Sequence, residues 1–106
     1  MSSAKWTDSE KRIARRAFDA ALQRELAEVM AEFKRRAVTA KEPEDMWTVE
    51  PYLTTARKQI DFKYDYRYSQ LLVGFGRLLR EGRIGASDMQ GLSEDKLAHI
   101  RRVASL

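Results

Sequence analysis

Apolar residues recur at spacings of three and four along the first third of the chain. They are Phe18, Leu22, Leu26, Val29, Phe33 and Ala37. This period is that of one face of an α-helix. Thr7 and Glu10 have the spacing of a capping box, and Pro43 is the first helix-breaking residue that follows. The pattern predicts one long helix over about residues 8–39.

A second series with the same spacing follows Pro43. Its members are Val49, Leu53, Ala56, Ile60, Tyr64, Arg67, Leu71, Phe75 and Leu78. It predicts a second long helix over about residues 44–81, which Gly82 ends as a C-terminal cap. Pro51 lacks a backbone donor and clashes with the preceding turn, so we expect the helix to kink or to begin there.

The stretch "DFKYDYRYS" at residues 61–69 also has an aromatic ring at every second position, from Phe62 to Tyr68. Strict alternation is typical of a half-buried β-strand. The alternation covers only this stretch, whereas the helical series extends from Val49 to Leu78. We therefore predict that the stretch is part of the second long helix.

The last part of the chain predicts a small helical head over about residues 86–104. Ser87 is expected to cap a short turn or helix, and Ser93 to start a final helix with Leu97 and Ile100 facing inward. The first helix alone would be ~48 Å long, whereas a compact domain of this size has a radius of gyration of ~13 Å. The predicted fold is a single all-α domain over residues 1–106: an elongated hairpin of long helices with a C-terminal helical head.

Charges in the central stretch predict a homodimer. Asp61 and Asp65 repel each other at helical i,i+4 spacing, as do Lys63 and Arg67. An antiparallel second copy would bring each acidic edge against a basic one, as a two-fold axis requires. The expected dimer interface comprises Leu53, Ile60, Asp61, Lys63, Tyr64, Asp65, Arg67 and Leu71. Phe62, Tyr66, Ser69 and Val73 form a second stripe, which we expect a partner chain to cover.

Composition narrows the function classes. The chain of 106 residues has no cysteine, which excludes disulfides and cysteine nucleophiles, and no apolar run long enough to span a membrane. No signal segment is recognisable at its start, so the cytoplasm is the expected location. The net charge of +4 is spread among interspersed charges of both signs, so nucleic-acid binding is a less favoured alternative.

Candidate chemistry is sparse. His99 is the only histidine and has no identifiable catalytic partner. Asp61 and Asp65 could form half a metal site, but an ion-pair role is favoured because neither His nor Cys is near. The "GFG" at residues 74–76 follows no predicted strand, so close helix packing explains it better than phosphate binding. The basic run at residues 11–16 is expected to be a solvated face. We therefore expect neither an enzyme nor a metal or other cofactor.

The central motif resembles that of the fluorescence recovery protein family of cyanobacteria. The shared residues are Ile60, Asp61, Lys63, Tyr64, Asp65, Arg67 and Ser69. The similarity extends through "EDMW" at residues 44–47, Leu53, Arg57 and "LLREG" at residues 78–82. It also includes "QREL" at residues 23–26 and the tryptophan before the capped first helix, so it covers nearly the whole chain.

The resemblance implies a non-enzymatic, all-helical homodimer without a cofactor. Members bind the photoactivated orange carotenoid protein through its C-terminal domain and speed its return to the resting form, which ends phycobilisome fluorescence quenching. Matched position by position, Trp47 and Arg57 would contact the partner. The motif at Asp61, Lys63, Tyr64, Asp65 and Arg67 would support the dimer.

Several positions depart from the family pattern. Glu50 and Pro51 replace a His-Asp pair, Val73 replaces an aromatic residue, and Phe62 and Tyr66 occupy positions that are small or polar in the family. The predicted partner-binding residues are Trp47, Glu50, Arg57, Phe62 and Tyr66. The leading hypothesis is a regulator of the orange carotenoid protein. The alternatives are an interaction module for a different protein in a bacterium without phycobilisomes and, less favoured, a small nucleic-acid binder.

Overall fold

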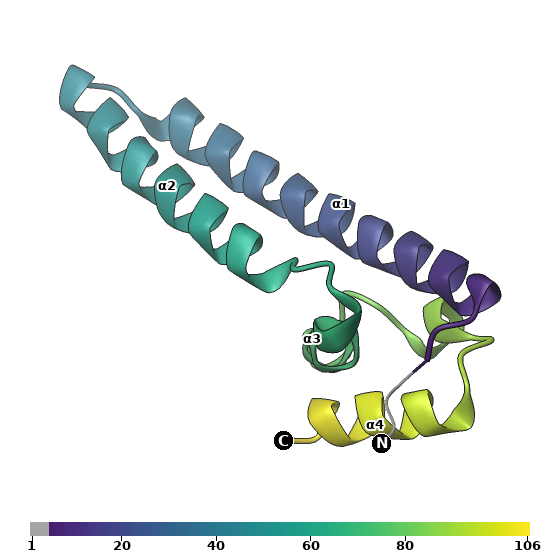
Figure 1. The fold of residues 1–106 in the computed structure, drawn as a ribbon. Coiled ribbons are helices and arrows are strands. Elements are labelled where there is room, and N and C mark those ends of the chain that lie inside the picture. The colour runs from purple at the N-terminus through teal and green to yellow at the C-terminus, as the bar shows by residue number, and fades with distance from the viewer. Residues whose placement is uncertain (1–4) are drawn as a thin grey trace.

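A computed structural model describes residues 5–106, which form helices and turns only (Figure 1). The all-α prediction is confirmed; residues 1–4 of the predicted domain lie outside the described part. In chain order the elements are α1 (Asp8–Thr39), the 3-10 turn η1 (Pro43–Asp45), α2 (Met46–Lys63), α3 (Tyr68–Arg80), the 3-10 turn η2 (Ala86–Met89) and α4 (Glu94–Ala104). Helices α1 and α2 form an antiparallel hairpin, and the head, made of α3, η2 and α4, lies beside the N-terminal half of α1.

Helix α1 occupies the predicted range because its N-terminus is capped as expected. The Thr7 hydroxyl accepts a hydrogen bond from the Glu10 amide at 3.1 Å, and the Glu10 carboxylate accepts one from the Thr7 amide at 3.1 Å. The resulting long hairpin makes the molecule elongated. Its extents are 57 × 25 × 24 Å and its radius of gyration is 17.0 Å, compared with ~13 Å for a compact domain of this length.

The hydrophobic core lies between the head and the N-terminal half of α1. It contains Ala14, Ala17, Phe18 and Ala21 of α1, Leu71, Phe75 and Leu78 of α3, and Ile84, Met89, Leu92 and Ile100. In α2 only Ile60 is buried. The free end of the hairpin therefore has little core of its own within one chain.

The predicted continuous helix over residues 44–81 is wrong, because residues 64–67 are not helical. We call this segment the joint. The Phe18 ring of α1 packs edge-on against Tyr64 at 5.4 Å and against Tyr66 at 4.8 Å between ring centroids. A continuous helix would point these two tyrosines in nearly opposite directions. Burial of both rings against one helix therefore favours a break, and the aromatic alternation coincides with this non-helical segment.

Pro51 does not mark the start of α2, which is one of the two outcomes that the sequence predicts for it. The helix begins at Met46, directly after η1, and contains Pro51 in its second turn. As the sixth residue of α2, Pro51 lies beyond the four N-terminal N–H groups that have no intrahelical partner, so it removes one backbone hydrogen bond from the helix. The turn η1 places its own proline, Pro43, at its first position.

The ends of the head elements follow local capping rules, with one exception. Gly82 has φ +76°, and the Arg83 amide donates to the Leu78 carbonyl at 2.9 Å, which is a Schellman motif. Ser93 caps α4 as predicted. Ser87 is not a cap: it lies inside η2, where Asp88 accepts from the Gly85 amide at 2.8 Å.

The two glycines of the "GFG" stretch differ in role. A Cβ atom at Gly76 would lie less than 3.0 Å from the Val103 side chain, so Gly76 permits the close contact between α3 and α4. A Cβ atom at Gly74 would meet no other atom within 4 Å. The close-packing prediction is therefore confirmed for Gly76 and wrong for Gly74.

Candidate protein-binding surfaces

The hairpin and the head are joined by a group of charged side chains, Glu25, Glu28, Lys63, Glu81 and Arg83, which we call the joint cluster. The Lys63 ammonium lies 2.9 Å from a Glu25 oxygen and 2.8 Å from a Glu81 oxygen. The Arg83 guanidinium lies 3.2 Å from Glu25 and 2.8 Å from Glu28. The side chains of Lys63 and Glu25 are only 13% and 11% exposed, so water screens their attraction weakly.

The joint cluster shifts the pKa values of its members. Burial alone would raise the pKa of Glu81, but hydrogen bonds from Lys63 and Arg83 outweigh it and hold this pKa below its ordinary value. Burial raises the pKa of Tyr64. The hydrogen bond that its hydroxyl donates to the Glu25 carboxylate, at 2.8 Å, raises this pKa further. Tyr64 is therefore a neutral hydrogen-bond donor at physiological pH.

The structure separates the predicted dimer residues into an internal and an exposed set. Ile60 and Leu71 are buried, and Lys63 and Tyr64 are bound to Glu25 of the same chain. Leu53 is 37% exposed. The exposed charged residues are Asp61 and Arg67, and Asp65 is half-buried.

Arg67 does not lie on the same helical face as Tyr64, although the predicted helical series contained both residues. Because the joint is not helical, Arg67 forms an ion pair with Asp65, and the Arg67 side chain is 68% exposed. A hydrogen bond from Arg67 lowers the pKa of Asp65. Asp61 lies 3.9 Å from Arg57 on α2, so neither aspartate lacks a cationic neighbour.

Three predicted partner-binding residues lie on α2 and are accessible. Trp47 is 70% exposed, and the Arg57 side chain is 86% exposed. Glu50 is exposed and accepts a hydrogen bond from Thr54 at 2.6 Å. Glu50 also borders an apolar depression of about 360 Å³, the hairpin groove, which is lined by Phe33, Ala37, Ala40, Met46, Val49, Glu50 and Leu53.

The other two predicted partner-binding residues do not share a face, contrary to the single stripe expected for them. Phe62 is 77% exposed, with the Arg77 guanidinium 5.8 Å from its ring centre. Tyr66 instead packs on Phe18 and lies under the Arg15 guanidinium, 4.3 Å from its ring centre. The joint separates them because it replaces the helical turn that would have aligned them.

Phe62 borders a second depression, the head groove, of about 510 Å³. Its lining residues are Asp61, Phe62, Lys63, Asp65, Arg67, Gln70, Val73, Gly74, Arg77, Arg80 and Val103. Val73 is 50% exposed, so the groove combines apolar surface with arginine side chains. It is a second candidate contact surface, which spans the joint from the end of α2 to α3 and α4.

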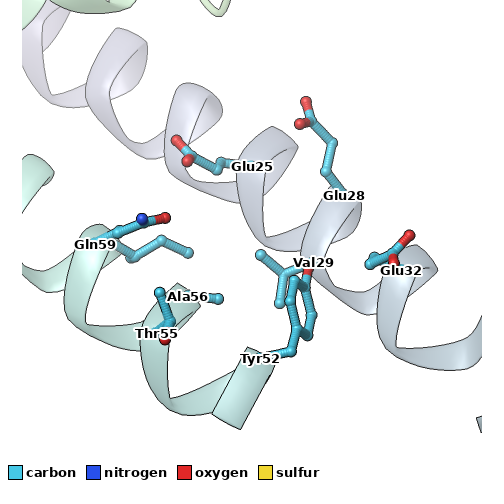
Figure 2. A pocket seen from close by; sticks show the side chains of 9 residues that line it. Glu25, Glu28, Val29, Glu32, Tyr52, Thr55, Ala56 and Gln59 are labelled. Atoms are coloured by element: carbon cyan, nitrogen blue, oxygen red, sulfur yellow. The ribbon is translucent and has the colours of Figure 1, made fainter. Parts of the chain in front are cut away.

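Figure 2 shows a third depression, of about 460 Å³, between the two helices of the hairpin. Glu25, Glu28 and Glu32 extend from α1, opposite Tyr52 and other α2 side chains. Each carboxylate already has a cationic partner, since Glu25 and Glu28 contact Arg83. Glu32 accepts hydrogen bonds from Arg35 and Arg36, which lower its pKa to about 2. Within residues 5–106 no group of three or more His, Cys, Asp or Glu side chains could hold a metal ion.

Sequence reasoning missed the buried charges of α1. Glu10 is 5% exposed and lies 3.1 Å from the ammonium of Lys96, which is 7% exposed. Glu10 and Glu25 fall on the same helical face as Ala14, Ala17 and Ala21. Two carboxylates on a stripe of small apolar residues were visible in the sequence. They could have indicated that cationic side chains from elsewhere in the chain pack against this face.

Comparison with known proteins covers almost the whole molecule. A family model described as "Photoprotection regulator fluorescence recovery protein" matches residues 6–104. The chain belongs to this family. It is 33% identical to the fluorescence recovery protein of Synechocystis sp. over 105 residues, which are 99% of this chain and 96% of the relative.

Solved structures of the family have the same fold. The fluorescence recovery protein of Fremyella diplosiphon is 34% identical and superposes with a TM-score of 0.89, covering 96% of this chain and 100% of that one. The Synechocystis structure is 33% identical with a TM-score of 0.90 and the same coverage. A role in photoprotection follows from membership of the family. None of the helices described for residues 5–106 is long and apolar enough to cross a membrane.

Proposed function

We propose that this chain is a non-enzymatic regulator that binds the photoactivated orange carotenoid protein and accelerates its return to the resting form, with the cytoplasm as the proposed compartment. The observation that carries the proposal is the exposure of Trp47 and Arg57 on α2 in a chain that matches the family from residue 6 to residue 104. A large aromatic ring and a guanidinium are favoured anchors in protein interfaces.

The proposed mechanism is a population shift. The chain would bind the photoactivated partner and bind a conformation on the way to rest more tightly still, and this difference in affinity moves the population towards rest. This requires surface contacts with differential affinity and no bond-making step or cofactor. The hairpin groove on α1 and α2 and the head groove across the joint supply apolar area beside charged groups.

We further propose that the chain acts as a homodimer formed through the hairpin. Leu26, Met30 and Leu53 are 39%, 53% and 37% exposed, and α2 has only one buried residue in the single chain. A second copy would bury this apolar surface and stabilise the free end of the hairpin. The exposed Asp61 and Arg67 and the half-buried Asp65 can contact the second copy at the edge of this interface.

A different protein partner is the second candidate. Glu50 and Pro51 replace the family's pattern between Trp47 and Arg57, and Phe62 is exposed at the head groove. Changes on both surfaces are what a changed partner would require. The scaffold and the joint would then be retained while the contact residues differ.

Nucleic-acid binding has less support from the geometry. The Lys11 ammonium lies 5.4 Å from the centre of the Tyr68 ring, and Arg15 lies over Tyr66. These cations therefore already contact the ring faces on which bases would stack. Absence of salt-dependent binding to single-stranded DNA and RNA at low ionic strength would eliminate this alternative.

The deciding experiment times the dark recovery of a photoconverted orange carotenoid protein with and without this chain. Acceleration is expected, with a large loss in Trp47→Ala and Arg57→Ala. Lys58→Ala, an exposed cation on the same helix, is the matched control and should retain the effect. No acceleration by the parent chain at molar excess would contradict the proposed function and favour a different partner.

A further inference from the structure

Glu25 connects more parts of the chain than any predicted site residue does. Its carboxylate receives the Lys63 ammonium at 2.9 Å, the Tyr64 hydroxyl at 2.8 Å and the Arg83 guanidinium at 3.2 Å. These donors come from the end of α2, from the joint and from the segment after α3. One buried side chain of α1 therefore holds both sides of the joint.

The joint has no intrinsic breaker that would enforce its bend. Residues 61–69 contain neither glycine nor proline, and the helical spacing of apolar residues continues through them. Yet Arg67, with φ −121° and ψ 132°, is extended. The local sequence is compatible with helix, so contacts from outside the joint must select the bent form.

Two kinds of contact are available for this selection. The Tyr64 and Tyr66 rings pack on Phe18, which favours the bend through apolar burial. Ring packing tolerates small rotations, whereas hydrogen-bonded charge pairs have defined distances and directions. At the joint itself, the contacts of Glu25 are therefore the directional constraint, while the buried pair of Glu10 with Lys96 ties α1 to α4 farther along the head.

We propose that Glu25 is a positioning residue that latches the head to the hairpin in one orientation. Its consequence for binding rests on the proposed function: the hairpin groove belongs to α1 and α2, whereas the head groove spans the joint from the end of α2 to α3 and α4. A partner that contacts both grooves needs the head in a constant orientation. Within residues 5–106, Arg83 is the one ion-pair partner of Glu28, whose side chain is 64% exposed, so Glu28 lacks this role.

The test measures the orientation directly. The chain has no cysteine, so Lys58→Cys on α2 and Ala98→Cys on α4 introduce a single pair of spin labels at exposed positions. Labelled chain is diluted with excess unlabelled chain so that only distances within one chain contribute. The parent should give one narrow distance distribution, and Glu25→Gln a broadened or shifted one.

Three further variants make the result specific. Lys63→Met removes a donor of the latch and should broaden the distribution as Glu25→Gln does. Glu25→Asp keeps the charge and should give a narrower distribution than Glu25→Gln. Glu28→Gln, the matched control, should resemble the parent. A Glu25→Gln distribution as narrow as the parent's, or an equal broadening in Glu28→Gln, would overturn the latch.

Recovery kinetics separate the latch from the proposed function. If the parent accelerates recovery, Glu25→Gln should lose most of that effect while remaining helical by circular dichroism. Full acceleration despite a broadened distribution would refute the positioning role. If no variant accelerates recovery, the proposed function fails, and the distance measurement alone decides the latch.

Discussion

Gly76 shows how strongly one residue can constrain the packing of the head. Because a Cβ there would lie less than 3.0 Å from Val103, Gly76→Ala should force α3 and α4 apart. We expect a loss of about 1–3 kcal/mol in the free energy of unfolding, as for other overpacked cores. Chemical denaturation monitored by circular dichroism measures this loss.

Gly74 provides the matched control two residues earlier in the same helix. Nothing lies within 4 Å of the place that a Cβ would take there, so Gly74→Ala adds helix propensity without a clash. Its expected effect is a gain of up to ~1 kcal/mol. Equal effects of the two substitutions would contradict the assigned contact between Gly76 and Val103.

Glu10 should make stability depend on pH. Burial opposes its ionisation, but hydrogen bonds from Thr7, Ser93 and Lys96 outweigh burial and hold its pKa below the ordinary 4.5. A lowered folded-state pKa contributes stability above the unfolded pKa, and this contribution is lost as pH falls through the folded value.

The corresponding variant is Glu10→Gln, which cannot ionise. Its free energy of unfolding should fall less steeply than that of the parent as pH is lowered below about 4.5. Denaturation curves at a series of pH values measure both slopes. Identical slopes in parent and variant would show that Glu10 does not contribute to acid sensitivity.

At the scale of elements, the joint depends on the Tyr64 hydroxyl as well as on its ring. Tyr64→Phe keeps the ring against Phe18 but removes the hydrogen bond to Glu25. A loss of about 1 kcal/mol is expected, and up to about 3 if the carboxylate remains unsatisfied. Thermal or chemical unfolding would measure it.

Tyr52 of α2 is the control for this change. Its ring lies under the Arg36 guanidinium, 4.4 Å from the ring centre, and the contact needs no hydroxyl. Tyr52→Phe should therefore leave stability within about 0.5 kcal/mol of the parent, as surface substitutions usually do. A loss matching that of Tyr64→Phe would show that the hydroxyl at the joint has no special role.

At the scale of the whole molecule, the exposed apolar face of the hairpin requires an explanation. We expect the parent chain to have the mass of a dimer in size-exclusion chromatography with light scattering. Leu53→Glu should shift it towards the monomer mass, because it would bury a charge in the proposed interface. Thr55→Glu, at an exposed position on the same helix, should remain dimeric. A monomeric parent would contradict the proposed dimer.

Helix α1, its capping box, the all-α class and the elongated shape were predictable from the sequence. Each depends on spacing and capping chemistry within a few residues, and local patterns report such features directly. The same applies to Gly82 and Ser93, whose capping roles need only their immediate neighbours.

Only the tertiary structure decided where the second helical series breaks and how its charges pair. Residues 61–69 fit a helix and an extended segment alike, and Phe18 and Glu25, far away in the sequence, select between the two. Lys63 and Tyr64 therefore face the interior of their own chain, while Phe62 and Tyr66 point to different surfaces. A local period cannot predict this outcome, because the free energy that favours the bend comes from contacts across the fold.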